Sequence, residues 1–264
     1  MTGPLTGKRG LVLGVANDRS ISWGIARAMA EAGAELAFSY QGEAFGRRVE
    51  PLAQSVGSDI LLDLDVTDAA SLDAGFTTLA ERWGSLDFVV HGIAFADKAE
   101  LAADFRFRDT TLANFQQTMQ ISCYSFIELA RRAAPMMTEG GTLMTLTFEG
   151  SNRVFPCYNV MGVAKAGLEA ATRYLANDLG PEGIRVNAIS PGPMKTLAGS
   201  AIGAARRTFK HADENAPMPV ASTLEAVGGT AVWLASDAGA CTTGQVVMVD
   251  GGFSVMGMPR LENM

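Results

Sequence analysis

Tyr158 and Lys165 are a phenol and an amine with six residues between them, in a segment whose spacing of apolar residues predicts a helix. From one to the other an α-helix turns by about 700°, close to two full turns, so both side chains are expected on one face. A lysine beside a phenol favours the phenolate and lowers the pKa of the tyrosine, which can then donate a proton or hydrogen bond to a developing oxyanion. Taken alone, the pair would be two ordinary surface residues, and it gains meaning from the rest of the chain.

A glycine-rich turn near the start of the chain could bind a nucleotide. Gly14 ends an apolar run, and Ser20 and Gly24 follow as a helical pattern begins. Glycines allow a tight turn and a close backbone approach, and the N–H groups at a helix start can bind a pyrophosphate. The spacing is not GxGxxG, so this turn alone is weak evidence.

Polar residues after the next two apolar runs could meet the adenosine half of a dinucleotide. Gln41 stands where an acidic residue usually holds the adenosine ribose, and an amide can still hydrogen-bond the ribose hydroxyls. No lysine or arginine follows until Arg47, which favours NADH over NADPH. Asp65 and Val66 could face the adenine, the alternative being a plain cap at the end of a strand.

Short apolar runs alternate with segments of helical period along the whole chain. We predict strands at residues 10–14, 35–40, 60–65, 86–91, 141–147, 184–189 and 245–249. We predict helices at residues 22–32, 49–55, 69–83, 112–137, 158–179 and 224–236. This alternation predicts an α/β fold, a Rossmann-like doubly wound parallel sheet of about seven strands with helices on both faces. No linker or repeat divides residues 1–264, so a single NAD-binding domain is expected.

The composition narrows the function classes. The chain has 264 residues, of which 48% are hydrophobic, and its net charge of −7 argues against a nucleic-acid partner. No apolar run approaches the roughly 18 residues needed to span a bilayer, and the first residues do not resemble a signal peptide. Cys123, Cys157 and Cys241 lack the spacing of a disulfide framework or a metal site. We therefore expect a cytoplasmic protein with no membrane partner and no metal.

Together these segments resemble the short-chain dehydrogenase/reductase superfamily and, within it, the divergent branch of bacterial enoyl-acyl-carrier-protein reductases. The shared pieces cover nearly the whole chain. They are Gly14-(x5)-Ser20-(x3)-Gly24, Gln41, Asp65-Val66, HGIAFADK at residues 91–98, Tyr158-(x6)-Lys165, GPEGIRVNAIS at residues 180–190, and VDGGF at residues 249–253. The wider superfamily places three residues between its tyrosine and lysine, whereas six mark the enoyl reductases.

The resemblance implies a reaction and its residues. NADH would reduce the trans-2 double bond of an enoyl-acyl-carrier-protein thioester, the last step of the fatty-acid elongation cycle. Tyr158 would stabilise and protonate the enolate, and Lys165 would hold the nicotinamide ribose. The resemblance further implies cofactor contacts from Ser20, Ile21, Ile93, Met194 and Thr196, beside those from Gly14, Gln41, Asp65 and Val66, and substrate contacts from Ala96, Phe148, Tyr158, Ala198 and Ile202.

Two further features concern the substrate and the assembly. Residues 197–205 are rich in small apolar side chains, and by resemblance they belong to a mobile substrate-binding loop at about residues 194–215. Arg206, Arg207 and Lys210 could steer an acidic acyl carrier protein, although a solvated helix face explains three cations nearly as well. The family resemblance also implies a homotetramer, with the helices at 112–137 and 158–179 among the packing surfaces.

The chain departs from the family at the expected substrate site. Phe148 stands where a second tyrosine is usual, Glu149 adds a carboxylate, and Ala94 replaces a glycine. Two alternatives therefore stay open. One is a carbonyl reductase or alcohol dehydrogenase of the wider superfamily, and the other is a weakly active NADH-binding paralogue.

Overall fold

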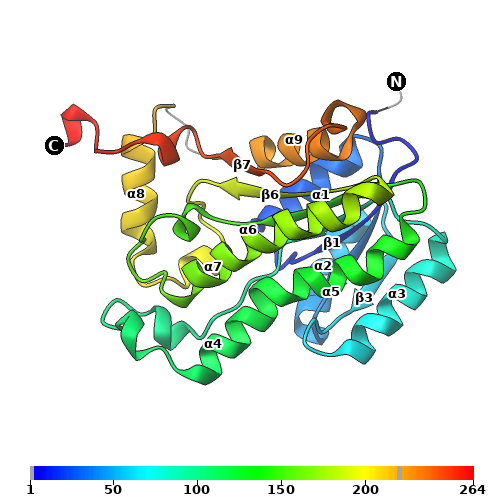
Figure 1. The fold of residues 1–264 in the computed structure, drawn as a ribbon, viewed down its shortest axis with the longest axis horizontal. Helices are drawn as coiled ribbons and strands as arrows, with labels where there is room; N and C mark the ends of the chain where they lie inside the picture. Colours follow the sequence, from blue (N-terminus) through cyan, green and yellow to red (C-terminus); the bar gives the residue numbers. More distant parts are fainter. Residues whose placement is uncertain (1–2, 219–221) are drawn as a thin grey trace.

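The fold is a parallel sheet of seven strands, seen in a computed structural model that describes residues 3–218 and 222–264 (Figure 1). The strand order is β3-β2-β1-β4-β5-β6-β7. The strands are β1 (Arg9–Leu13), β2 (Glu35–Tyr40), β3 (Ile60–Asp63), β4 (Phe88–His91), β5 (Gly141–Leu146), β6 (Ile184–Pro191) and β7 (Val246–Val249). The predicted doubly wound fold is therefore confirmed, and its strand order reverses between β1 and β4, where ligands bind in such sheets.

Helices cover both faces of the sheet. One face carries α1 (Ile21–Glu31), α2 (Glu43–Ser55) and α9 (Leu224–Ala235), and the other carries α3 (Ala69–Trp83), α5 (Ser125–Ala133) and α6 (Val160–Leu179). Side chains alternate between the faces along each strand. Leu11 and Leu13 of β1 accordingly pack under α3 and α6, and Val12 packs under α1 and α9. Two separate hydrophobic layers result.

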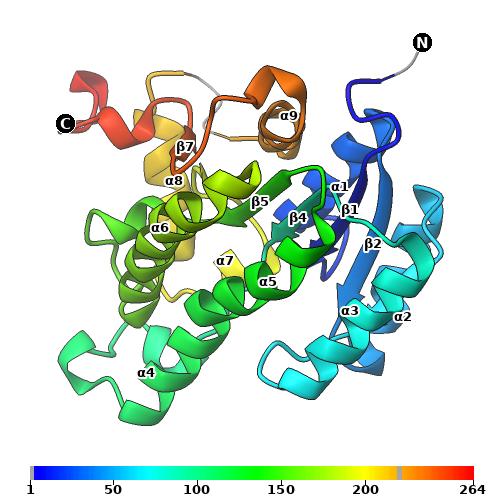
Figure 2. The same cartoon turned by 45° about the vertical axis from the view of Figure 1, so that its right-hand side comes forward.

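Three further helices and several short 3-10 turns complete the chain. The helices are α4 (Leu112–Met119), α7 (Leu197–Ser200) and α8 (Ala205–Asn215). The 3-10 turns are Lys98–Leu101, Phe107–Asp109, Ala134–Met136, Glu149–Ser151, Gly180–Glu182, Asp237–Gly239, Phe253–Val255 and Leu261–Asn263. Figures 1 and 2 place α8 and the C-terminal segment together at one end of the molecule and α3 at the other. None of the helices in the described ranges is long and apolar enough to cross a membrane.

The structure differs from the predicted elements in two places that bear on the site. The single helix expected at residues 112–137 is interrupted by a π-helical turn, Gln120–Tyr124, between α4 and α5. The helix expected from residue 158 begins only at Val160, because Asn159 has a φ of 44° that no α-helix contains. At both places a side chain bonds to a segment distant in sequence, Ser122 to Phe95 and Asn159 to Glu100.

Candidate active site

The turn after β1 is built for close backbone approach. Gly14 has a φ of 88°, and a Cβ on it would lie 2.2 Å from the carbonyl oxygen of Gly92, at the end of the neighbouring strand β4. The hydroxyl of Ser20 accepts hydrogen bonds from the N–H groups of Ala16 and Asn17 at 3.0 and 3.1 Å. These bonds fix the turn just before α1 begins at Ile21, so the helix start faces the switch point of the sheet.

Gln41 and Asp65, which follow β2 and β3, come together. Asp65 accepts hydrogen bonds from the side chain and the N–H of Thr67 at 2.6 and 2.8 Å. The bond from the Thr67 side chain lowers the pKa of Asp65 most, burial opposes it, and a smaller lowering comes from Gln41. The nearest cation in sequence, Arg47, is paired with Glu43. This corner therefore presents an amide and a carboxylate.

The other residues expected at the cofactor follow β3, β4 and β6. Val66 and Ile93 are half-buried against the layer under α3 and α6. Met194 packs on the layer under α1 and α9. Thr196 caps α7 by accepting a hydrogen bond from the N–H of Gly199 at 3.0 Å. Because parallel strands end at one edge, all four residues lie along that edge.

Tyr158 lies in a turn just before α6, not on it. The expected shared helix face with Lys165 is therefore wrong for Tyr158, since the positive φ of Asn159 breaks the helical path between them. The tyrosine is 8% exposed. Its burial, and then the negative charge of Glu169, raise the pKa of Tyr158, so the lowering expected from Lys165 is also wrong. The phenol is protonated at neutral pH and is therefore a hydrogen-bond donor.

Lys165 is buried on α6 and reaches the end of β5. Its Nζ donates a hydrogen bond to the carbonyl oxygen of Leu146 at 2.7 Å. Burial lowers the pKa of Lys165 to about 8, against smaller raising effects of Cys123 and Glu169. One turn along α6, Glu169 accepts a hydrogen bond from the Thr147 hydroxyl at 2.6 Å. Two buried side chains of α6 thus hold consecutive residues where the chain leaves β5.

An apolar cluster surrounds the tyrosine. In this tyrosine cluster Leu101, Tyr158 and Met161 are buried, and Ala96, Phe148, Phe155 and Ile202 pack against them. The ring of Phe148 meets that of Tyr158 edge-on at 5.1 Å between centroids. Ala96, Phe148 and Ile202, all expected at the substrate, are thus brought to the tyrosine. Ala198 is not in the cluster, and it is exposed on α7.

Hydrogen bonds that the sequence did not suggest hold the turn before α6. The Nδ2 of Asn159 donates to the carbonyl oxygen of Glu100 at 2.8 Å. The Glu100 carboxylate is buried and accepts from Thr111 and from Asn114, on the loop before α4 and on α4. In the π-helical turn, the Ser122 hydroxyl accepts from the N–H of Phe95 at 2.9 Å and donates to its carbonyl oxygen at 3.0 Å. Small polar residues inside an apolar helix pattern are the only sequence signal for these contacts.

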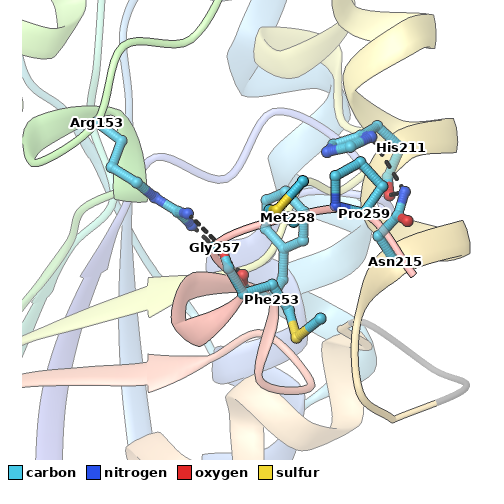
Figure 3. A pocket seen from close by; sticks show the side chains of 8 residues that line it. Arg153, His211, Asn215, Phe253, Gly257, Met258 and Pro259 are labelled. Carbon is cyan, nitrogen blue, oxygen red and sulfur yellow. Dashed lines mark hydrogen bonds between the residues drawn. The ribbon is translucent and has the colours of Figure 1, made fainter. Parts of the chain in front are cut away.

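Glu149 pairs with Arg153 at 2.7 Å. Arg153 also donates to the carbonyl oxygens of Met256 and Phe253, at 3.0 and 3.4 Å, and thereby binds the C-terminal segment (Figure 3). Burial raises the pKa of Glu149, and Arg153 opposes this rise. The extra carboxylate therefore has a structural partner beside the site.

Along the outer face of α8, Arg206, Arg207 and Lys210 are exposed, and Lys210 pairs with Glu214 at 3.5 Å. Across residues 3–218 and 222–264, no group of three or more His, Cys, Asp or Glu side chains could hold a metal ion.

The doubly wound sheet, the glycine turn after β1, and a tyrosine and a lysine beside the end of β5 define an oxidoreductase of the short-chain dehydrogenase/reductase type. Comparison with known proteins narrows this class. A family model described as enoyl-(acyl carrier protein) reductase matches residues 14–254. The chain belongs to this family.

Individual relatives are similar in sequence to this chain along almost its whole length. Enoyl-[acyl-carrier-protein] reductase [NADH] 2 of Rhizobium meliloti (strain 1021) is 56% identical over 262 residues, covering 99% of this chain and 97% of the relative. Enoyl-[acyl-carrier-protein] reductase [NADH] 1 of the same organism is 53% identical, covering 99% and 95%. The crystal structure of the reductase from Anaplasma phagocytophilum in complex with NAD has a TM-score of 0.95 and 50% identity, covering 99% of each chain.

Proposed function

We propose that this chain reduces the trans-2 double bond of enoyl-acyl-carrier-protein thioesters with NADH, the last step of fatty-acid elongation. It would do so in the cytoplasm as a single NAD-binding domain, residues 1–264. The observation that carries the proposal is Tyr158, a buried and protonated phenol within an apolar cluster, followed by a buried lysine on α6. Such a phenol can hydrogen-bond the oxygen on which negative charge develops in the transition state.

The residues at the carboxyl edge fit a dinucleotide. Gly14 leaves a cradle that any side chain would fill, and the start of α1 offers N–H groups for a pyrophosphate. Ser20, which shapes the turn, and Ile21, the first residue of α1, would border this cradle. Val66, Ile93, Met194 and Thr196 would line the rest of the edge.

Lys165 keeps N–H groups beyond the one bound to Leu146, and these would donate to the nicotinamide ribose hydroxyls. The reduced nicotinamide supplies the hydride.

The corner formed by Gln41 and Asp65 supports NADH rather than NADPH. A 2′-phosphate there would approach the Asp65 carboxylate, while Arg47 is engaged with Glu43. The ribose hydroxyls of NADH would instead find an amide and a carboxylate as hydrogen-bond partners. Comparable kcat/KM values with NADH and NADPH would contradict this preference.

Tyr158 and the tyrosine cluster would act on the substrate together. The apolar side chains exclude water, which strengthens the hydrogen bond from the phenol to the developing enolate oxygen. Ala96, Phe148 and Ile202 would contact the acyl chain, and Ala198 would reach it through movement of the loop at residues 194–215. The exposed cations of α8 would steer the acidic carrier protein.

Loss of NADH absorbance with trans-2-enoyl thioesters tests the activity. Replacing Tyr158 by Phe removes a donor that acts on transition-state charge, so turnover should fall roughly 10²–10³-fold while NADH affinity stays the same. Thr78→Val, which removes a hydroxyl from the exposed face of α3, is the control and should keep the parent's rate. A near-normal rate in Tyr158→Phe would refute the role of the phenol. Turnover of ketones but not of enoyl thioesters would favour the carbonyl reductase alternative, and NADH binding without turnover would favour the paralogue.

A further inference from the structure

We propose that Phe155 closes the acyl-binding space beside Tyr158 and so sets the longest acyl chain that the enzyme reduces efficiently. This inference rests on the proposed function, since it assumes that the tyrosine cluster receives an acyl chain.

Phe155 belongs to two apolar clusters at once. On one side it packs in the tyrosine cluster, where its ring lies 4.7 Å from that of Phe148. On the other side it packs in a C-terminal cluster made of Ala212, Ala216 and Phe253. Its ring lies 6.3 Å from that of Phe253. The rings of Tyr158, Phe148, Phe155 and Phe253 therefore form a row that leads from the site to the C-terminal segment.

The backbone fixes the ring of Phe155 in this row. A residue before proline is confined to extended conformations, and Pro156 follows directly. The carbonyl oxygen of Phe155 also accepts a hydrogen bond from the N–H of Tyr158 at 3.2 Å. Because the turn that carries the ring also carries the tyrosine, Phe155 holds a set position relative to the reacting end of the substrate.

The far side of the row is held in place independently. Arg153 binds the carbonyl oxygens of Phe253 and Met256, and its guanidinium lies 5.7 Å from the centre of the Phe253 ring. Beyond Phe253 lies a cavity of about 130 Å³, which Figure 3 shows between Arg153, His211, Asn215 and the segment 256–259. The C-terminal cluster is thus anchored, and removal of the Phe155 ring would leave space in front of Phe253.

A chain that reaches Phe155 must displace a packed phenyl ring to extend further. Removing that ring gives room for several methylene groups, and each methylene buried in an apolar site raises the affinity by about fourfold. Short acyl chains end before Phe155 and gain nothing from its removal. The prediction is therefore a change in the preference between long and short chains, not a general change in rate.

The test measures kcat/KM for trans-2-butenoyl, trans-2-octenoyl and trans-2-dodecenoyl thioesters of coenzyme A in the parent, Phe155→Leu and Phe155→Ala. The ratio of dodecenoyl to butenoyl efficiency should rise at least about tenfold in Phe155→Ala and less in Phe155→Leu. The matched control is Phe253→Leu, which loosens the far side of the row but keeps Phe155 as the barrier, so the ratio should stay at the parent's value. NADH affinity by fluorescence titration reports whether each variant is folded, and Phe155→Leu carries the test if the alanine variant is not.

An unchanged ratio in a folded Phe155 variant would overturn the inference and leave the proposed function intact. An equal rise for Phe253→Leu would also overturn it, because general loosening would then explain the effect. If the parent reduces none of the three thioesters, the proposed function fails and this inference fails with it.

Discussion

Tyr158 and Lys165 are both buried, and burial acts on them in opposite directions. Each group resists the loss of water around its charged form, so the pKa of Tyr158 rises and the pKa of Lys165 falls to about 8. The phenol is therefore neutral over the whole physiological range. The ammonium is close to losing its proton just above that range. The lysine, not the tyrosine, should give the site its pH dependence on the alkaline side.

NADH affinity should weaken above pH 8. The ammonium is present below the pKa of Lys165 and is lost above it, and its N–H donors to the ribose are weakened with it. The groups around Lys165 are Cys123 on the π-helical turn, Glu169 on α6 and His91 on β4. The Kd for NADH, measured by fluorescence titration between pH 6.5 and 9.5, should rise by up to about tenfold for each unit above the pKa. Lys165→Met should bind weakly with no such rise, and a flat profile in the parent would contradict the assignment.

Asn159 should be a positioning residue for Tyr158. Its φ of 44° and ψ of −125° are costly for any residue except glycine, and its side chain donates to the Glu100 carbonyl. Asn159→Ala keeps the strain and loses the bond, so both thermal stability and kcat should fall. The cost should be about 1–3 kcal/mol in stability.

Asn159→Gly separates the two contributions. Glycine accepts this conformation, so the variant loses the hydrogen bond but also relieves the backbone strain. It should be more stable than Asn159→Ala, with a kcat between those of the parent and the alanine variant and with little change in KM. Equal behaviour of the two variants would show that the backbone strain has no part in placing the tyrosine.

Between elements, His91 joins β4 to β5 and α5. Its ring nitrogens are 2.8 Å from the hydroxyls of Thr145 and Ser125, and the side chain has no exposed surface. Burial first, and then the charge of Lys165, lower the pKa of His91 to about 3. Between pH 6.5 and pH 3 the unfolded state therefore binds a proton that the folded state does not. Stability contributed by His91 is present above this window and is lost as the pH falls through it.

Urea unfolding at pH 7 and pH 5 measures this effect. The loss of unfolding free energy should be about 2 kcal/mol larger in the parent than in His91→Gln, which has no group to titrate in this range. Carboxylates titrate alike in both proteins, so they cancel in the comparison. Equal losses in the two proteins would mean that His91 is not held neutral.

The sequence predicts elements well where the local pattern decides them. Residues 35–40 and 69–83 match β2 and α3 to the residue, because an apolar run and an Asp68 cap followed by Gly84 define their ends. The interruption of the helix at 112–137 was not predictable, because Ser122 in the π-helical turn accepts a hydrogen bond from Phe95, which is distant in the sequence.

In the site, too, features decided by the local sequence could be predicted, and features decided by distant contacts could not. The residues at strand ends could be placed on one edge from the alternation of strands and helices. The pKa of Tyr158, the ion pair of Glu149 and the double packing of Phe155 depend on burial and on partners from other segments. A one-dimensional pattern carries no information on them.

At the scale of the whole molecule, the homotetramer stays a prediction, and exposed apolar side chains support it. Tyr124, Ile127, Val163 and Tyr174 are exposed apolar side chains on the π-helical turn, α5 and α6. Val163 and Tyr174 lie on one stripe of α6, since a step of 11 positions turns the helix by about 1,100°, close to three full turns. Symmetric packing of this surface would remove it from water.

Light scattering at micromolar concentration should give a tetramer. Val163→Glu places a charge on this surface and should lower the assembly state, whereas Thr78→Glu on the exposed face of α3 should leave it unchanged. A monomeric parent would refute the prediction.

The hydrogen bonds from Arg153 to the C-terminal segment have a consequence for biosynthesis. Arg153 and Met256 are 103 positions apart in the chain, so on the ribosome the arginine emerges long before its partner is made. Translation proceeds at about 5–20 residues per second, and during those seconds the five strands up to β5, of the seven in the sheet, can already pair. The aromatic row beside Tyr158 cannot close until the last strand and the segment behind it have left the tunnel. The nascent chain therefore pairs most of its sheet before Phe253 can complete the aromatic row behind Phe155.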